Sequence, residues 1–417
     1  MVETLAEKMD GMSNMKRLFV LGLLLSVTLS CNEKVASDKD VAESIAYGEY
    51  DKVTMVIPPL SFDDDGPMTK VDFDLGTLKY LWAEKDSVGI FPELGSQIYF
   101  SMAEGMGQSV ATFDGGGWAL RRNSAYYSYF PFVADYYIDK EAIPVCFLGQ
   151  EQVGNGNLNN ANLGKNCFMV AKGVADENTG NLMFTYERLQ MPFLFTIPVD
   201  AGTYIALDVL AGSNVIATSG TMNAISLDKV IHNAVYDDHL SIALKEISFD
   251  DPATLIVVAL FPPFDIYGKQ LTLNLTKSDG QIVTSSVFGK TYALGKAYKN
   301  TPNLSVYPIV AELPGDGGSF NFQIMTSGTN TYSVKSDVSW LTINNAPTSG
   351  NAIVTVTAGK GANKERVGHI IVSEDVTYNG TTITLQNKIT VTQDLVGMSM
   401  GVGGWEDSGE DYGGAAQ

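Results

Sequence analysis

The chain has 417 residues, 45% of them hydrophobic, and 47 acidic against 27 basic residues give a formal net charge of −20. This length suits two or three domains with cores of their own, and the hydrophobic content excludes a disordered chain. An acidic surface repels nucleic-acid backbones, so we expect no nucleic-acid partner.

The chain begins with the features of an export signal. Lys16 and Arg17 precede an apolar run over residues 18–29, which is too short to span a bilayer comfortably. The run ends at a small residue followed by Cys31, an order that resembles a bacterial lipobox. The resemblance implies a signal peptide over 1–31 and lipidation of Cys31, and the alternative is an ordinary cleaved signal. Two acyl chains give stable attachment to a membrane.

Residues 32–51 are polar and of mixed charge, which suits a tether between the membrane and the folded part. Strand signals then recur from about residue 52 to 395. Alternating leucines and a Ser-Asp-Gly turn over residues 271–283 predict a hairpin with one apolar face. The same alternation over residues 383–391 predicts a half-buried strand. We expect one short helix, over residues 227–235.

Changes in composition divide the β-rich part. Residues 313–318 read Leu-Pro-Gly-Asp-Gly-Gly and are the clearest linker, and a weaker division falls at 176–180. Residues 397–417 are Gly-rich and acidic and predict a flexible tail. The expected domains cover residues 52–178, 179–312 and 313–396.

The first two domains carry motifs in a distinctive order. They are residues 81–91 (Leu-Trp-Ala-Glu-Lys-Asp-Ser-Val-Gly-Ile-Phe), 111–113, Trp118, the aromatic stretch 126–132, 182–197 and 257–263. This order resembles the fimbrillin-like proteins, the type V (Mfa-like) pilins of gut and oral anaerobes. The resemblance implies tandem transthyretin-like β-sandwiches, made as lipoproteins, in a fimbrium at the outer membrane.

The resemblance also implies assembly by strand exchange with other fimbrial subunits. An N-terminal strand is removed, and the groove that it leaves accepts a strand from another subunit. The candidate donor-exchange strand lies at residues 53–57, with Val53, Met55 and Ile57 on one face.

Processing in that family commonly follows arginine, and this chain departs from the pattern. It has no arginine between Arg17 and Arg121. A cut after Lys52 or Lys70 needs a protease of different specificity.

The third domain has its own set of motifs. They are Tyr-Ser-Val at 332–334, Asp-Val-Ser-Trp-Leu-Thr-Ile at 337–343, residues 351–356, Arg-Val-Gly at 366–368, residues 370–372 and Ile-Thr-Val-Thr-Gln at 389–393. They are similar to the BACON domain, which implies an immunoglobulin-like β-sandwich and a carbohydrate or mucin ligand. Trp340 is placed within a strand and read as core, with sugar stacking as the alternative.

Catalytic chemistry is missing from the sequence. It contains no G-x-S-x-G elbow and no H-E-x-x-H motif, so we expect neither an enzyme nor a cofactor. The sparse histidines, with His232 and His239 flanking two aspartates, read as a polar loop. Residues 63–66 (Asp-Asp-Asp-Gly) offer oxygen ligands for calcium but read as a solvated loop, so no metal is expected.

Two cysteines and two tryptophans also have an expected state. Cys146 and Cys167 either pair in an oxidising compartment or remain buried thiols. Trp82 and Trp118 are read as core residues.

The sequence thus favours an all-β cell-surface lipoprotein that is a fimbria (pilus) subunit. The tail 397–417 lacks the apolar alternation of a donor strand, which favours a tip or accessory position. Its expected role is adhesion to glycan or host matrix. The alternative is a surface glycan-binding lipoprotein that does not polymerise.

Overall fold

The computed structural model describes residues 52–62, 81–118, 120–135, 137–156, 164–328, 330–361 and 363–396. Within these residues the chain is all β, as the sequence predicts, with one 3-10 turn, η2 (Gly164–Asn166), and no α-helix. No helix there is long and apolar enough to cross a bilayer. The signal peptide, Cys31, the tether, residues 63–66, Lys70 and the tail all lie outside the described residues.

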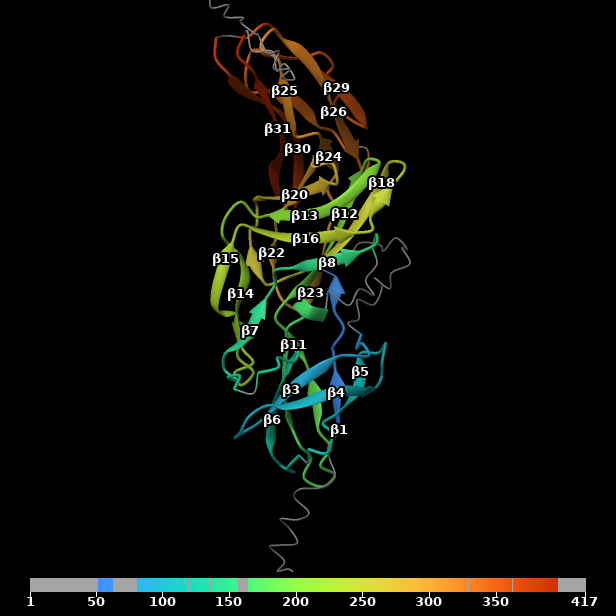
Figure 1. Cartoon of the computed structure of the whole chain (residues 1–417), viewed down its shortest axis with the longest axis vertical. Helices are drawn as coiled ribbons and strands as arrows, with labels where there is room; N and C mark the ends of the chain where they lie inside the picture. Colours follow the sequence, from blue (N-terminus) through green and yellow to red (C-terminus); the bar gives the residue numbers. More distant parts are fainter. Residues whose placement is uncertain are drawn as a thin grey trace, which may run out of the picture.

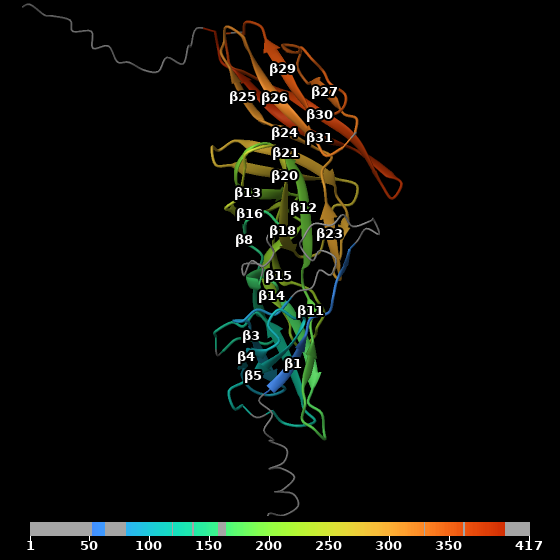
Figure 2. The same ribbon diagram turned by 90° about the vertical axis from the view of Figure 1, so that its right-hand side faces the viewer.

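The strands form three units stacked along the long axis of the molecule (Figures 1 and 2). The first unit surrounds a core that includes Trp82 and Phe113, the middle unit one that includes Phe193 and Leu273, and the third unit one that includes Phe322. The amino-terminal strand β1 lies at one end of the stack and the last strands, β30 and β31, lie at the other.

The first unit is an eight-stranded sheet that curls around its core. In sheet order the strands are β10 (Met183–Thr185), β1 (Lys52–Val56), β5 (Val110–Asp114), β4 (Ile98–Glu104), β3 (Ser87–Pro92), β6 (Ala125–Phe130), β9 (Met169–Val174) and β11 (Glu187–Arg188). The two end strands, β10 and β11, are separated in the chain only by Tyr186. The edges of the sheet therefore meet at this residue.

The middle unit packs several sheets around the largest core. Its four-stranded sheet has the order β18 (Ala253–Phe261), β12 (Met191–Val199), β23 (Lys296–Asn300) and β2 (Ser61–Phe62). Smaller sheets are formed by β15 (His232–Asp237), β14 (Ile216–Met222) and β7 (Ile143–Cys146), and by β19 (Phe264–Asp265) with β22 (Thr291–Tyr292).

A ten-stranded sheet joins the middle and third units without a break. Its order is β28 (Leu341–Ile343), β29 (Ala352–Ala358), β26 (Gly318–Thr326), β24 (Leu304–Tyr307), β21 (Ile282–Phe288), β20 (Gln270–Lys277), β13 (Gly202–Leu210), β16 (His239–Lys245) and β8 (Gln150–Val153), with β17 (Ser248–Phe249) also on β13. The shared strand is β24, which pairs with β21 of the middle unit and with β26 of the third.

The third unit completes its sandwich with a four-stranded sheet. Its order is β25 (Val310–Leu313), β31 (Thr381–Gln393), β30 (Arg366–Tyr378) and β27 (Ser333–Ser336). Leu304 and Val306, which precede the expected linker at 313–318, and Leu313, its first residue, lie in the core of this unit. The long β30–β31 hairpin reaches down beside the middle unit (Figure 2).

Side-chain amides cover the free edge of β18. Gln150 on β8 donates to the carbonyl of Leu260 and accepts from its N–H, both at 2.7 Å. Gln152 bonds the backbone of β18 in the same way at Ile256 and Val258. Because an unpaired strand edge invites pairing with other chains, these amides act as a substitute strand.

The predicted strands at 271–283 and 383–391 are confirmed. β20 and β21 pair as an antiparallel hairpin, and Leu271, Leu273 and Leu275 are buried on one face. On β31 the residues Ile389 and Val391 lie in the core of the third unit, and Leu385 on the same face is buried too.

The expected helix over residues 227–235 is wrong. β15 begins at His232, and the preceding Leu227 and Lys229 have positive φ angles of 52° and 57°. A right-handed helix does not accept these angles.

Trp82, Trp118 and Trp340 differ in how deeply they are buried. Trp82 is fully buried and packs edge-on against Phe113, as expected. Trp118 is 62% exposed, so its assignment to the core is wrong; it follows three consecutive glycines in a surface turn. Trp340 is half-buried in a turn before β28 rather than inside a strand.

Candidate functional site

The candidate exchange strand is β1, and it occupies an interior position in the first unit. It pairs antiparallel with β5 over its whole length, from Lys52 opposite Asp114 to Val56 opposite Val110. On its other side it runs parallel to β10. The alternation of apolar and polar residues turns Val53, Met55 and Ile57 into the core, where all three are buried.

Tyr186 closes the sheet over β1. Its backbone N–H donates to the carbonyl of Val56 at 2.9 Å, and its hydroxyl lies 2.6 Å from the Ser128 hydroxyl and 3.5 Å from the sulfur of Met55. Burial raises the pKa of Tyr186 above its ordinary value. The neutral phenol therefore links β1 to β6, on the far side of the core.

After β1 the chain passes from the first unit to the middle unit through Pro58, Pro59 and Leu60. A guanidinium N–H of Arg188, on β11, donates to the carbonyl of Pro58. β2 then pairs parallel with β23 at the edge of the four-stranded sheet. One segment thus contributes a strand to each of two units, and a cavity of about 260 Å³ lies beside it.

The position of β1 separates the two candidate cleavage points. Lys52 is the first residue of β1, so a cut after it leaves Val53 to Ile57 attached to the rest of the chain. A cut after Lys70 lies beyond both β1 and β2 in sequence. Only the second cut frees the strand.

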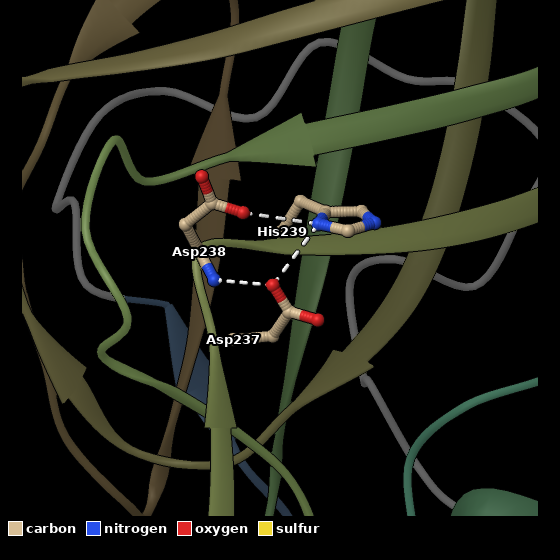
Figure 3. A group of neighbouring side chains, drawn as sticks. All are labelled: Asp237, Asp238 and His239. Carbon is tan, nitrogen blue, oxygen red and sulfur yellow. Dashed lines mark hydrogen bonds and ion pairs between the residues drawn. The ribbon is translucent and has the colours of Figure 1, made fainter.

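The polar loop around His239 is a small, self-satisfied cluster (Figure 3). Its imidazole Nδ1 lies 3.1 Å from Asp238 Oδ1 and 3.2 Å from Asp237 Oδ1, and Asp237 Oδ1 accepts the N–H of Asp238. The hydrogen bond from Asp238 raises the pKa of His239. The carboxylates and the ring satisfy one another in the turn between β15 and β16, and we assign no metal to them.

The cysteines and Trp340 lie outside β1, although Cys167 belongs to the same buried cluster as Met55. Cys146 is exposed and Cys167 is buried, and both are free thiols. Burial raises the pKa of Cys167 to about 12, which leaves it an inert core thiol. Trp340 lies against Arg366, whose guanidinium carbon is 4.3 Å from the ring centroid. Its indole therefore packs on this side chain as well as on the core.

No protein-family profile and no curated protein matches the chain. Among solved structures it is similar to a "putative cell adhesion protein" from Bacteroides uniformis, with 14% identity, a TM-score of 0.39, and coverage of 53% of this chain and 87% of the other. A protein of the same description from Bacteroides ovatus gives 12% identity, a TM-score of 0.41, and coverage of 60% and 90%. A fimbrial protein from Bacteroides ovatus gives 11% identity, a TM-score of 0.28, and coverage of 61% and 49%.

Two features of the site carry no local sequence signal. The parallel pairing of β1 with β10 joins Thr54 to Met183, which are far apart in the chain. The hydrogen bond from Arg188 to the carbonyl of Pro58 likewise joins residues that are far apart in the chain. Alternation identifies a strand and its buried face, but it does not identify the partner strand.

Proposed function

We propose that the chain is a cell-surface fimbria subunit that accepts a strand from another subunit in place of β1. The observation that carries the proposal is the position of β1. It is the first described strand of the chain, yet it fills the gap between β5 and β10 with three buried apolar side chains. Such a strand is held by the fold, and within the described residues its chain connection to the rest runs only through Ile57.

Removal of β1 would leave a groove suited to a new strand. The edges of β5 and β10 would present unpaired N–H and C=O groups, and the pockets of Val53, Met55 and Ile57 would be open. Each such side chain stabilises its buried position by about 1.5–3 kcal/mol. Backbone pairing and three alternate pockets are the elements of recognition by strand addition.

The other end of the described chain supports a tip or accessory position. The last strand, β31, pairs with β30 along its whole length and with β25 on its other side. Its residues Ile389 and Val391 lie in the core of the third unit, and Leu385 is buried as well. A strand so placed cannot be donated without unfolding that unit, so the proposed subunit accepts a strand and donates none of its described strands.

The proposal includes attachment and adhesion. Lipidation of Cys31, which its place after an apolar run favours, would hold the precursor at the outer membrane until β1 is removed. The third unit lies at the far end of the molecule from β1. This position suits contact with a carbohydrate or host-matrix ligand.

A reversible covalent lock on β1 tests the proposal. Thr54 lies directly opposite Thr112 on the face of the sheet away from the core. Residues paired in this way have Cβ atoms about 4.5–5.5 Å apart, which a disulfide can bridge with little adjustment. Thr54→Cys with Thr112→Cys, in a Cys146→Ser background, should abolish SDS-resistant ladders in surface extracts, and reductant should restore them.

The matched control joins β3 to β4 in the same unit without touching β1. It is Ser87→Cys with Ser101→Cys, a pair that also lies directly opposite. The control should assemble in both redox states. Ladders from the oxidised lock variant would show that β1 is not exchanged. A wild-type chain that stays monomeric and binds polysaccharide would favour the non-polymerising alternative.

A further inference from the structure

A cavity of about 300 Å³ lies where the middle and third units meet. Ser286 and Phe288 of β21, Lys290, Asn300 of β23 and Leu385 of β31 contribute to its lining. The surrounding joint is fixed by contacts between the units. Gln270 exchanges two hydrogen bonds with the backbone of Gln386, both at 2.8 Å. The cavity is therefore held between two sheets whose relative position is set.

Two buried polar atoms at this joint have no protein partner. The Asn300 side chain is 3% exposed, and its Nδ2 makes no hydrogen bond within the described residues. Glu374 on β30 is 4% exposed; its Oε2 accepts from Asn303 Nδ2 at 2.9 Å, while its Oε1 is unpartnered. A buried polar group without a partner costs about 1–3 kcal/mol. Of these two residues Asn300 lines the cavity, so a ligand hydroxyl there can accept from its Nδ2.

Two cations stand at the same cavity in a strongly acidic protein. The Lys290 ammonium is mostly buried and lies 4.5 Å from the centroid of the Tyr378 ring. Lys299 is exposed at the cavity wall. Burial raises the pKa of Glu374, the acidic residue buried at this joint. The cavity thus offers ammonium and amide donors where the overall charge is −20.

We propose that this cavity, the joint cavity, binds a sugar ring that carries a carboxylate, such as a uronic acid residue of an acidic glycan. Lys299 would receive the carboxylate with Lys290 beside it, and Asn300 would hydrogen-bond a ring hydroxyl. Phe288, Val376 and Leu385 supply the apolar wall that the face of a sugar ring contacts. The choice of a glycan rests on the adhesive role proposed above, whereas the preference for an anion rests on the cavity itself.

Titration of the full-length chain with D-glucuronate, D-glucose and acetate tests the proposal. Binding is read from ligand-observed NMR and from the shift in thermal midpoint. Lys299→Glu reverses an exposed charge at the cavity and should weaken glucuronate binding by about tenfold or more, because a charge-assisted contact becomes a repulsion. Lys335→Glu is the matched control, since Lys335 is exposed on β27, away from the cavity.

Glucuronate binding that Lys299→Glu weakens and Lys335→Glu preserves supports the inference. Equal binding of glucose and glucuronate, or equal loss in both variants, would overturn it. The absence of glucuronate binding would overturn it too, and would leave an ordered water as the partner of Asn300 and Glu374. These readouts use the unassembled chain, so their failure is distinct from a failure of strand exchange.

Discussion

The hydroxyl of Tyr186 lies 3.5 Å from the sulfur of Met55, where the two edges of the curled sheet of the first unit meet. The same hydroxyl bonds Ser128, which in turn donates to the carbonyl of Gly89 at 3.2 Å. A short polar chain therefore crosses the core beneath β1. Its integrity depends on a neutral phenol.

Tyr186→Phe should change the response of the first unit to alkaline pH. Burial raises the pKa of Tyr186, so its contribution to stability is complete below the unfolded value of about 10 and is lost as the pH rises through the folded value. We expect the free energy of unfolding of the variant to be about 0.5–1.5 kcal/mol lower than that of wild type at pH 7. Between pH 7 and high pH, the free energy of unfolding should fall less in the variant than in wild type. Urea unfolding at several pH values measures both effects. Burial also raises the pKa of Tyr129 to about 12, so Tyr129→Phe is the control. If this variant loses stability at high pH as wild type does, Tyr186 is the group responsible for that loss.

Gln150→Leu should weaken the middle unit. The change leaves the N–H and C=O of Leu260 buried without the amide that now pairs with them. Each group left unsatisfied costs about 1–3 kcal/mol, and the bared edge of β18 should promote association. Chemical denaturation and light scattering report the two effects. Gln281→Leu, in an exposed turn, is the control, and equal stability of the two variants would contradict the role given to Gln150.

A fragment of residues 302–396 should fold alone, whereas 316–396 should not. The longer fragment includes β24 and β25, whose residues Leu304, Val306 and Leu313 lie in the core of the third unit. Loss of three buried aliphatic side chains removes about 1.5–3 kcal/mol each, which is comparable with the stability of a small domain. Thermal melts followed by circular dichroism compare the two. If the fragment 316–396 melted cooperatively at the same temperature as 302–396, the third unit would instead begin at the Gly/Pro segment.

Gly368→Ala should destabilise the third unit. A Cβ at this position would lie 2.4 Å from Val338 Cγ2 and 3.0 Å from Trp340 Cζ2, so both side chains would have to move. We expect a loss of about 1–3 kcal/mol, with weaker packing of Trp340 on Arg366. Gly359→Ala is the control because its Cβ would meet open space. Tryptophan fluorescence and urea unfolding separate the two substitutions, and an unperturbed Gly368→Ala would contradict this account of the Arg-Val-Gly motif.

The elements that sequence analysis predicted correctly are those with strict local alternation. The β20–β21 hairpin and β31 each place apolar residues on one face, and the turn at Gly280, with φ of 83°, has the residue that this conformation favours. The short helix failed because positive φ angles at Leu227 and Lys229 depend on the turn before β15. Local periodicity does not carry that information.

The candidate site could be predicted only in part. The alternation at Val53, Met55 and Ile57 predicted a strand with a buried face, and these residues are buried. Its flanking strands could not be predicted, because pairing with β10 joins residues far apart in the chain. The joint cavity was missed for the same reason, since Asn300 and Leu385 come to line one cavity only after the middle and third units have packed.

The shared strand β24 has a mechanical consequence. A flexible linker would let the third unit swing when pulled, but here β24 is hydrogen-bonded to β21 on one side and to β26 on the other. A pull on the third unit is therefore resisted by a continuous ladder of backbone bonds, together with the buried contact of Ser286 with Asn387 at 2.8 Å. The middle and third units should therefore transmit force as one rigid body. Among the described strands none is shared in this way by the first and middle units, so rupture under force should begin between those two units.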